Sequence, residues 1–351
     1  MIKAKTNPPP RPALLSVLLL ASALALWPPP APAAVVLMYH HFGDQRYPTT
    51  NIRLTQFEAQ LDEIAARHYQ VWPLQRIVDR LLAQQPLPDD VVALTIDDAF
   101  VSVYTEAWPR LKKRRWPFTV FVSTDDVDRH LPAFMSWDQM RAMQHDGASF
   151  ANHAQFHESL ATARAGEDEQ HWLARVRASL QHAQQRLTTE LGTAPLLFSY
   201  PYGEYSTTVA ALVRELGLVA FGQHSGVIDL HADLRALPRF AMSEHYADLA
   251  QFRDKLRGRT LPVSAIEPWE PVTREARPTL RITLADVPLR RDELRCFVNG
   301  GPVTIRWLDR TQQQFIMQAS RPLPAGRSRY NCTAPAGDGR YYWFSQPWLR
   351  R

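Results

Sequence analysis

Short apolar runs alternate with amphipathic helix patterns over the first two thirds of the chain, and this alternation constrains the fold most strongly. The expected strands are residues 35–40, 91–96, 117–122, 148–151, 196–200 and 218–222. The expected helices are residues 55–69, 74–84, 102–114, 136–145, 167–191 and 206–216. Strands that alternate with helices imply βα units and a mainly parallel sheet or barrel. In such folds the functional residues gather at the carboxyl ends of the strands.

The N-terminal segment has the order of a secretory signal peptide. Three basic residues precede an apolar run from Ala13 to Trp27, and a Pro-rich stretch then ends in Ala31-Pro32-Ala33. This order predicts a signal peptide over residues 1–33 and a periplasmic or extracellular mature protein. The apolar run has 15 residues, which is short for a membrane span. An uncleaved anchor is the alternative, and no Cys lies near the cleavage point to support a lipid anchor.

The charge of the chain argues against a nucleic-acid partner. The formal net charge of +5 falls to +2 when residues 1–33 are removed, because that segment carries three basic and no acidic residues. No run of five or six like charges occurs elsewhere. A nucleic-acid-binding surface would need a concentrated basic patch. Nothing in the sequence indicates an oligomeric state.

The composition changes near residue 260, which divides the mature chain. Residues 34–260 form the expected α/β domain, and residues 261–279 are a Pro-rich linker. Residues 280–351 contain short alternating runs, which predict a small β-sandwich-like domain. The only two cysteines, Cys296 and Cys332, lie in this part. In an exported protein they are expected to form one disulfide, with two buried free thiols as the alternative.

Two pairs of polar residues fall at expected strand ends. Asp97 and Asp98 follow a buried strand, and His153 and His157 follow the strand at 148–151 with a spacing that suits one side of a helical turn. Two imidazoles and a carboxylate suit a catalytic zinc, with cobalt or nickel as alternatives. The second carboxylate would remain free to take a proton from a metal-activated water. Each pair alone is also compatible with a turn or a solvated helix face.

Three spaced motifs resemble those of the NodB-type polysaccharide deacetylase family. Residues 95–98 (T-I-D-D) resemble its T-F-D-D motif, and residues 153–157 (H-A-Q-F-H) resemble H-[ST]-x-x-H. Residues 199–203 (S-Y-P-Y-G) resemble R-x-P-[YF]-G, and residues 36–40 look like the segment that often opens the domain. The resemblance covers about residues 35–260. It implies a distorted (β/α) barrel and metal-dependent removal of N-acetyl groups from a polysaccharide such as poly-N-acetylglucosamine or a chitin-like chain.

The resemblance also implies roles for individual residues. Asp97 would be the general base, and Tyr202 would offer a backbone N–H to the oxyanion. The metal ligands would be Asp98, His153 and His157. Tyr200 and Pro201 would shape the substrate groove. His40 is a candidate substrate-binding residue because it follows the first strand, although a structural loop histidine fits that position equally well.

The sequence departs from the family pattern at two functional positions. Ser199 stands where the family often has an Arg that orients the base. Poly-N-acetylglucosamine deacetylases are similar in lacking it, and residues 200–205 (Y-P-Y-G-E-Y) look like their third motif, but the second hydrolase domain of their enterobacterial members is not evident.

The late L-x-L-H motif, which supplies a general-acid His, is also not evident. Arg239 lies at about that place and is a candidate substrate-binding residue, and His224 or His245 would replace the acid. These departures motivate an alternative, namely a non-catalytic glycan-binding or export protein that retains the fold. A glycosidase with paired carboxylates would leave the His pair unexplained.

Tryptophans in the C-terminal part have two interpretations. Trp307, Trp343 and Trp348 could form a platform on which sugars stack, or they could belong to the core of a small β domain.

Overall fold

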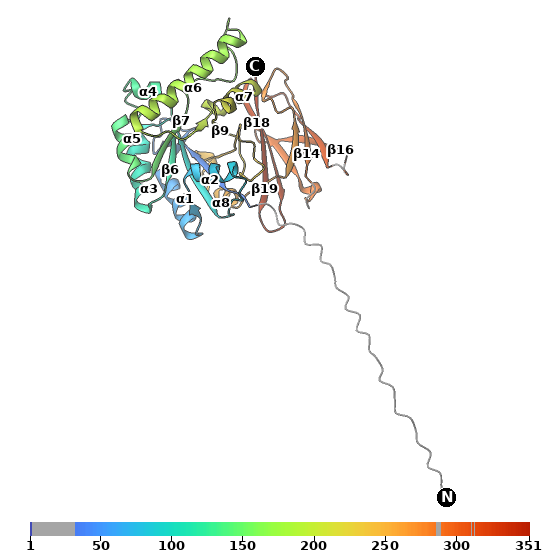
Figure 1. Cartoon of the computed structure of the whole chain (residues 1–351). Helices are drawn as coiled ribbons and strands as arrows, with labels where there is room; N and C mark the ends of the chain where they lie inside the picture. Colours follow the sequence, from blue (N-terminus) through green and yellow to red (C-terminus); the bar gives the residue numbers. More distant parts are fainter. Residues whose placement is uncertain (2–31, 286–288, 310, 312) are drawn as a thin grey trace.

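The computed structural model describes Met1 and residues 32–285, 289–309, 311 and 313–351. The predicted signal peptide therefore lies almost entirely outside the described residues. Figure 1 shows an α/β part, coloured blue to yellow, beside an all-β part in orange and red. Within the described part of the chain, none of the helices combines the length and the apolar character needed to cross a bilayer.

The α/β part is built on a parallel sheet that curls into a distorted barrel. Its strands in spatial order are β10 (Phe240–Ala241), β1 (Val35–Tyr39), β5 (Val91–Asp97), β6 (Phe118–Val122), β7 (Ala148–Asn152), β8 (Leu197–Ser199) and β9 (Val219–Phe221), with β4 (Gln70–Val71) beside β5. A parallel bridge joins Phe221 of β9 to Leu237, and Phe240 pairs with Leu37 of β1. The segment 237–241 therefore passes from one edge of the sheet to the other and closes the barrel.

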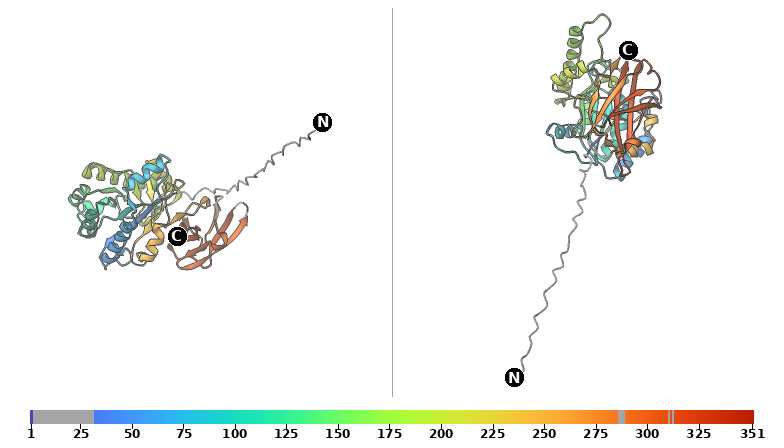
Figure 2. Two further views of the ribbon diagram at one scale, coloured as in Figure 1. Left: turned by 90° about the horizontal axis from the view of Figure 1, so that it is seen from below. Right: turned by 90° about the vertical axis from the view of Figure 1, so that its right-hand side faces the viewer.

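Helices cover the outside of this sheet, as Figure 1 and the two views in Figure 2 show. They are α1 (Leu54–Ala66), α2 (Leu74–Leu82), α3 (Trp108–Arg114), α4 (Thr124–Asp128), α5 (Trp137–Gln144), α6 (Glu169–Leu191), α7 (Thr207–Glu215) and α8 (Leu249–Leu256). All five residues of β1 are buried, and neighbours such as Val35 and Val36 belong to different apolar clusters. Apolar side chains on both faces of the strands explain why they read as continuous apolar runs.

The expected alternation of strands and helices is confirmed, with boundaries that differ by a few residues. The segment 102–114 is one expected helix, but it begins with a π-helical turn, η1 (Val103–Ala107), before α3. A short parallel pair, β2 (His41–Phe42) and β3 (Asn51–Ile52), lies beside the main sheet and was not expected.

The C-terminal part is a second sheet that folds around its own core. Its strands in spatial order are β11 (Arg259–Thr260), β19 (Tyr341–Arg350), β18 (Gly326–Pro335), β15 (Arg295–Val298), β16 (Gly301–Asp309), β17 (Gln314–Ala319), β14 (Thr279–Leu284) and β12 (Val263–Glu267), with β13 (Val272–Thr273) beside β19. Strands along the whole sheet, from β14 to β19, contribute side chains to one apolar cluster. The Tyr330 side chain reaches through this core to two other segments, since its hydroxyl donates to Pro278 O and accepts from Ala319 N. The expected all-β part is present, as one continuous sheet.

The segment predicted as a Pro-rich linker is part of this sheet. Residues 261–279, predicted as a Pro-rich linker, contain β12 and β13. The prolines do not prevent this pairing, because β12 lies at the edge of the sheet and Pro268, Pro271 and Pro278 lie between strands. Proline is tolerated at sheet edges and strand ends, where its missing N–H costs no ladder hydrogen bond.

The two cysteines form the expected disulfide. Cys296 of β15 is paired in register with Cys332 of β18, and the two are bonded. The tryptophans do not share an exposed platform, because Trp348 is buried in the core and Trp343 packs edge-on against Phe240 of the barrel. Trp307 packs against Phe315 within the β part.

Candidate active site

The two adjacent aspartates lie where β5 ends. Asp97 is the last residue of the strand, and Asp98 follows it with a φ of 75°. Few residues other than glycine adopt this left-handed conformation, although aspartate tolerates it better than most. On a regular strand the two carboxylates would point to opposite faces. The turn lets each carboxylate reach groups from other strands at the same end of the barrel.

Asp98 meets both histidines of the predicted metal set. Its Oδ1 lies 3.2 Å from Nε2 of His153 and 3.1 Å from Nε2 of His157. The ligand atoms of the three residues lie within 4.8 Å of one another. Burial would raise the pKa of the Asp98 carboxyl, but the two imidazoles outweigh burial and hold that pKa well below its usual range.

The arrangement of these atoms fits a divalent cation. Nδ1 of His153 lies 2.7 Å from the carbonyl oxygen of Ser199, which can only accept, so Nδ1 carries a proton and Nε2 is the ring nitrogen that faces Asp98. Within the described residues, neither His153 Nε2 nor Asp98 Oδ1 has a hydrogen-bond partner, and both are buried. Two lone pairs facing each other repel unless a cation or a proton lies between them. A carboxylate with two imidazoles is a donor set that suits zinc and similar ions.

The two histidines lie in a loop, so the expectation of a helical turn is wrong. His153 follows β7 directly, and Ala154 has a φ of 67° that no helix contains. The Asn152 side chain fixes this bend, since its oxygen accepts from Ala154 N at 2.8 Å and its nitrogen donates to Leu180 O. The side-chain convergence that the spacing predicted is present, but a loop produces it.

Asp97 is held by an arginine that comes from the closing segment of the barrel. Arg239 Nη1 and Nη2 donate to the two Asp97 oxygens at 2.7 and 2.8 Å, and Nη2 also donates to Ser199 Oγ. All three side chains are fully buried. Burial raises the pKa of Asp97, but the charge and hydrogen bonds of Arg239 outweigh it, so the net shift is downward. Asp97 is therefore ionised at neutral pH.

His40 is the histidine that lies next to Asp97. Its Nε2 is 3.9 Å from Asp97 Oδ2, and its side chain retains 12% exposure, so it can meet a ligand in the site. Burial lowers the pKa of His40, although the carboxylates of Asp98 and Asp97 oppose the shift.

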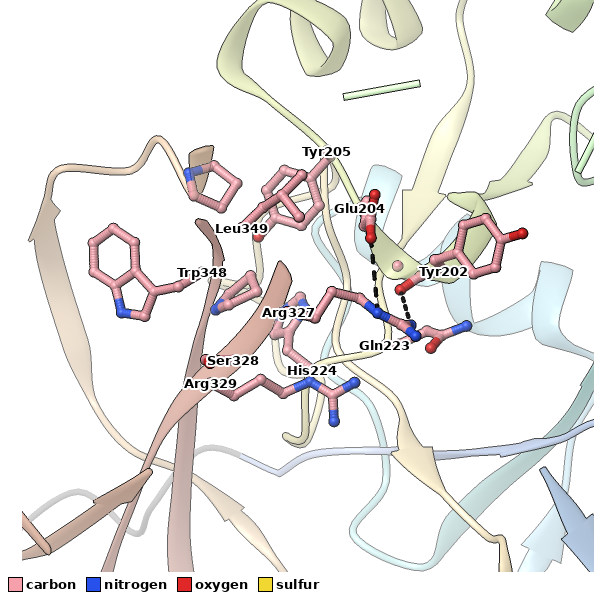
Figure 3. Close-up of a pocket in the computed structure, with 13 residues that line it drawn as sticks. Tyr202, Glu204, Tyr205, Gln223, His224, Arg327, Ser328, Arg329, Trp348 and Leu349 are labelled. Carbon is pink, nitrogen blue, oxygen red and sulfur yellow. Dashed lines mark hydrogen bonds and ion pairs between the residues drawn. The ribbon is translucent and has the colours of Figure 1, made fainter. Parts of the chain in front are cut away.

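His224 does not occupy this position. Burial, with Arg329 and Arg239 nearby, lowers its pKa to about 3, so the ring is neutral. Its Nδ1 would lie 2.6 Å from a Cβ on Gly222, and its ring faces Tyr205 and the β part (Figure 3). The prediction that His224 acts as the acid is therefore not supported. The side chain of His245 lies outside the described side chains.

The third motif forms a tight turn over the metal set. Tyr202 has φ 59° and ψ 3°, and its ring packs edge-on against His157 at 4.4 Å. The next residue must be glycine, because Gly203 has a φ of 68° and a Cβ there would lie 2.6 Å from the side chain of Gln223. Tyr202 is 37% exposed, and Phe156, in the loop between the two histidines, is 42% exposed.

Three residues predicted to bind substrate are buried in this structure. Tyr200 is fully buried and its hydroxyl donates to Arg235 O at 2.9 Å. Pro201 is buried, and Arg239 is fully buried against Asp97. The direct contacts with substrate expected for these three stay predictions, and in this structure their side chains are buried. Only a charged residue in the otherwise apolar segment 236–242 hinted at a special role for Arg239.

Comparisons with known proteins agree with this geometry. Residues 84–221 match the family model of the polysaccharide deacetylases. The chain is 24% identical over 242 residues to the poly-beta-1,6-N-acetyl-D-glucosamine N-deacetylase of Escherichia coli (strain K12), which covers 58% of this chain. The same match spans only 35% of that relative's length.

Solved structures share the fold of the α/β part. The structure of IcaB from Ammonifex degensii has a TM-score of 0.56 at 24% identity, covering 65% of this chain and 98% of that one. The Streptococcus pyogenes deacetylase PplD, solved in complex with acetate, has a TM-score of 0.55 at 22% identity, covering 61% and 94%. At these identities the likeness establishes the fold alone. The segment that matches the family model, residues 84–221, lies within this α/β part.

Proposed function

We propose that this protein is an exported, metal-dependent enzyme that removes N-acetyl groups from a polymer of β-linked N-acetylhexosamine. The observation that carries the proposal is the adjacency of two sets of residues. Asp98, His153 and His157 form a cation-binding set, and the next residue in the chain, Asp97, is an ionised carboxylate held by Arg239.

The residues of the chain can be assigned to the steps of amide hydrolysis. Asp97 accepts a proton from the attacking water while the water oxygen bonds to the carbonyl carbon. The Tyr202 backbone N–H stabilises the oxyanion that develops. The C–N bond then breaks as His40 donates a proton to the departing amine nitrogen, which leaves acetate and a free amino sugar. His40 replaces His224 in this role because it lies beside Asp97 and opens to the site.

A divalent ion held by Asp98, His153 and His157 would lower the pKa of the water and polarise the acetyl carbonyl. Zinc is the expected ion, with cobalt or nickel as alternatives, because imidazole and carboxylate ligands suit all three. The Ser199 carbonyl supports this set, since its bond to His153 Nδ1 fixes which ring nitrogen faces the ion.

The proposed substrate is a chain such as poly-β-1,6-N-acetylglucosamine. This rests on the curated relative, which is named as a deacetylase of that polymer. The exposed rings of Tyr202 and Phe156, the second of which lies between His153 and His157 in the chain, would stack against sugar rings. An exported location would bring the enzyme to such a polymer and is compatible with the disulfide and the signal-like N-terminus.

Acetate release tests the proposal. The purified mature protein should release acetate from β-1,6- or β-1,4-linked N-acetylglucosamine pentamers. Asp97→Asn should abolish release while leaving metal content unchanged, because Asp97 does not belong to the ligand set. Asp254→Asn, an exposed carboxylate on α8, is the matched control and should behave as wild type.

The alternative of a non-catalytic glycan-binding protein rested on the missing Arg and the missing His. Arg239 and His40 supply groups of those types at the site. Glycan binding without acetate release, across both linkages and with each candidate metal, would favour that alternative instead.

A further inference from the structure

The C-terminal β part reaches the active-site turn through one side chain. Arg327 extends from β18 to the third motif, where its Nη1 donates to the carbonyl oxygen of Tyr202 at 3.0 Å. Its Nε lies 3.7 Å from Oε1 of Glu204, two residues further along the same turn. Figure 3 shows both contacts as dashed lines. Arg327 therefore touches both the backbone and a side chain of the turn.

The turn needs support because its backbone is strained. Tyr202 is held in the left-handed region at φ 59°, which costs about 1 kcal/mol or more for a residue with a Cβ. Two internal hydrogen bonds, from Gly203 N to Tyr200 O and from Glu204 N to Pro201 O, close the turn. Arg327 fixes the Tyr202 carbonyl by a hydrogen bond, and the Arg327 guanidinium also lies 5.4 Å from the centroid of the Tyr202 ring.

The same contacts extend to the loop that carries a metal ligand. Glu204 accepts a hydrogen bond from Ser159, two residues after His157. The Tyr202 hydroxyl donates to His157 O at 3.3 Å. Arg327, Glu204, Ser159, Tyr202 and His157 thus form one connected group across the metal-binding loop, the oxyanion turn and β18.

The β part is fixed firmly enough to act as a support. Arg340 pairs with Asp89 at 2.9 Å below the barrel, and Trp343 packs against Phe240, the neighbour of Arg239. The cavity between the turn and β18 has a volume of only about 20 Å³, which is room for about one water and excludes a sugar. The contact is therefore a packed junction and not a ligand pocket.

We infer that the C-terminal β part completes the active centre, with Arg327 as a positioning residue that holds the Tyr202 turn in its catalytic conformation. Arg327 does not touch the reacting atoms. It fixes the peptide group between Tyr202 and Gly203 through the Tyr202 carbonyl oxygen. It also holds Glu204, which accepts a hydrogen bond from Ser159 in the loop of His157. This inference rests on the proposed function, because it assigns Tyr202 to the oxyanion of that reaction.

Substitution of Arg327 tests the inference in the full-length mature protein. Arg327→Gln should lower kcat for a chitopentaose substrate about tenfold, with KM changed less than threefold, because the turn matters most in the transition state. Arg327→Lys should recover part of the loss, since one ammonium can still donate to Tyr202 O. Arg306→Gln, an exposed arginine on β16, is the control and should match wild type.

Amide hydrogen exchange supplies a readout that does not depend on activity. Peptides covering residues 200–206 should exchange faster in Arg327→Gln than in wild type or Arg306→Gln, because the bonds of Gly203 and Glu204 open more often. Unchanged exchange in these peptides overturns the inference, and so does faster exchange with unchanged kcat. If wild type releases no acetate, the proposed function fails, while the exchange data still decide whether Arg327 holds the turn.

Discussion

Arg239 binds both carboxylate oxygens of Asp97, although the two residues are 142 positions apart in the chain. The pair forms because the segment 237–241 crosses the gap between β9 and β1, which brings Arg239 to the end of β5. Ser199, at the place where the family often has an arginine, accepts a hydrogen bond from the same guanidinium. Asp97 thus has its cationic partner in the segment that closes the barrel, and not at position 199.

Arg239→Lys should lower kcat by about ten- to a hundredfold, because an ammonium cannot bind both oxygens of Asp97. Arg239→Gln should also destabilise the fold, and the free energy of unfolding should fall by about 3–5 kcal/mol. The reason is that this change leaves a buried carboxylate without a cation. Where Arg239→Gln folds, the acid limb of its kcat/KM profile should move to higher pH, since Arg239 holds the Asp97 pKa down. Full activity in Arg239→Lys would show that Asp97 does not need this geometry.

The choice of general acid can be decided by two histidine variants. His40→Asn should reduce kcat by about a hundredfold or more, which is the usual effect of removing a positioned acid. His224→Asn should retain at least about a third of wild-type kcat, because the His224 ring faces Tyr205, whereas His40 lies 3.9 Å from Asp97. Steady-state acetate release at neutral pH measures both. The reverse ranking would restore the assignment that the sequence suggested.

Glu63 makes stability depend on pH far from the active site. Its carboxylate joins α1 to α8 through Arg253 at 2.9 Å and also binds Arg67. The Arg253 hydrogen bond is the main cause that lowers the pKa of Glu63 from 4.5 to about 2. A lowered carboxyl pKa stabilises the fold above the unfolded pKa, and this stabilisation is lost as the pH falls through the folded pKa.

Glu63→Gln should therefore lower the free energy of unfolding by about 1–2 kcal/mol at pH 7. The difference from wild type should shrink between pH 4.5 and about 2. Thermal unfolding followed across this range measures it. A difference that stays constant down to pH 2 would mean that the carboxylate charge is not responsible.

Removing the disulfide should destabilise the β part. Cys296 and Cys332 close a loop of 36 residues, and for that length the unfolded-chain entropy predicts a loss of about 2–4 kcal/mol in Cys296→Ser with Cys332→Ser. Thermal unfolding of the double variant, beside the oxidised wild type, measures the loss. An unchanged unfolding temperature would show that β15 and β18 pair equally well without the bond.

The sequence predicted the parts of this molecule that depend on local patterns. Apolar periodicity located the strands and helices, and the aspartates and histidines at strand ends located the residues that could hold a metal ion. Arg239 could not be assigned in this way, because its partner depends on how the barrel closes. The burial of Tyr200 and the contact from Arg327 could not be predicted either. The first depends on the loop that carries Arg235, and the second depends on the packing of two separate sheets.

The central claim is that Asp98, His153 and His157 hold a catalytic divalent ion. Its most direct test is metal content and acetate release, measured on the same samples of wild type and Asp98→Asn. Wild type should carry about one ion per chain, lose acetate release when a chelator removes the ion, and regain it when zinc, cobalt or nickel is added. Asp98→Asn should lack both the ion and the activity. Acetate release that persists in metal-free wild type would contradict the account.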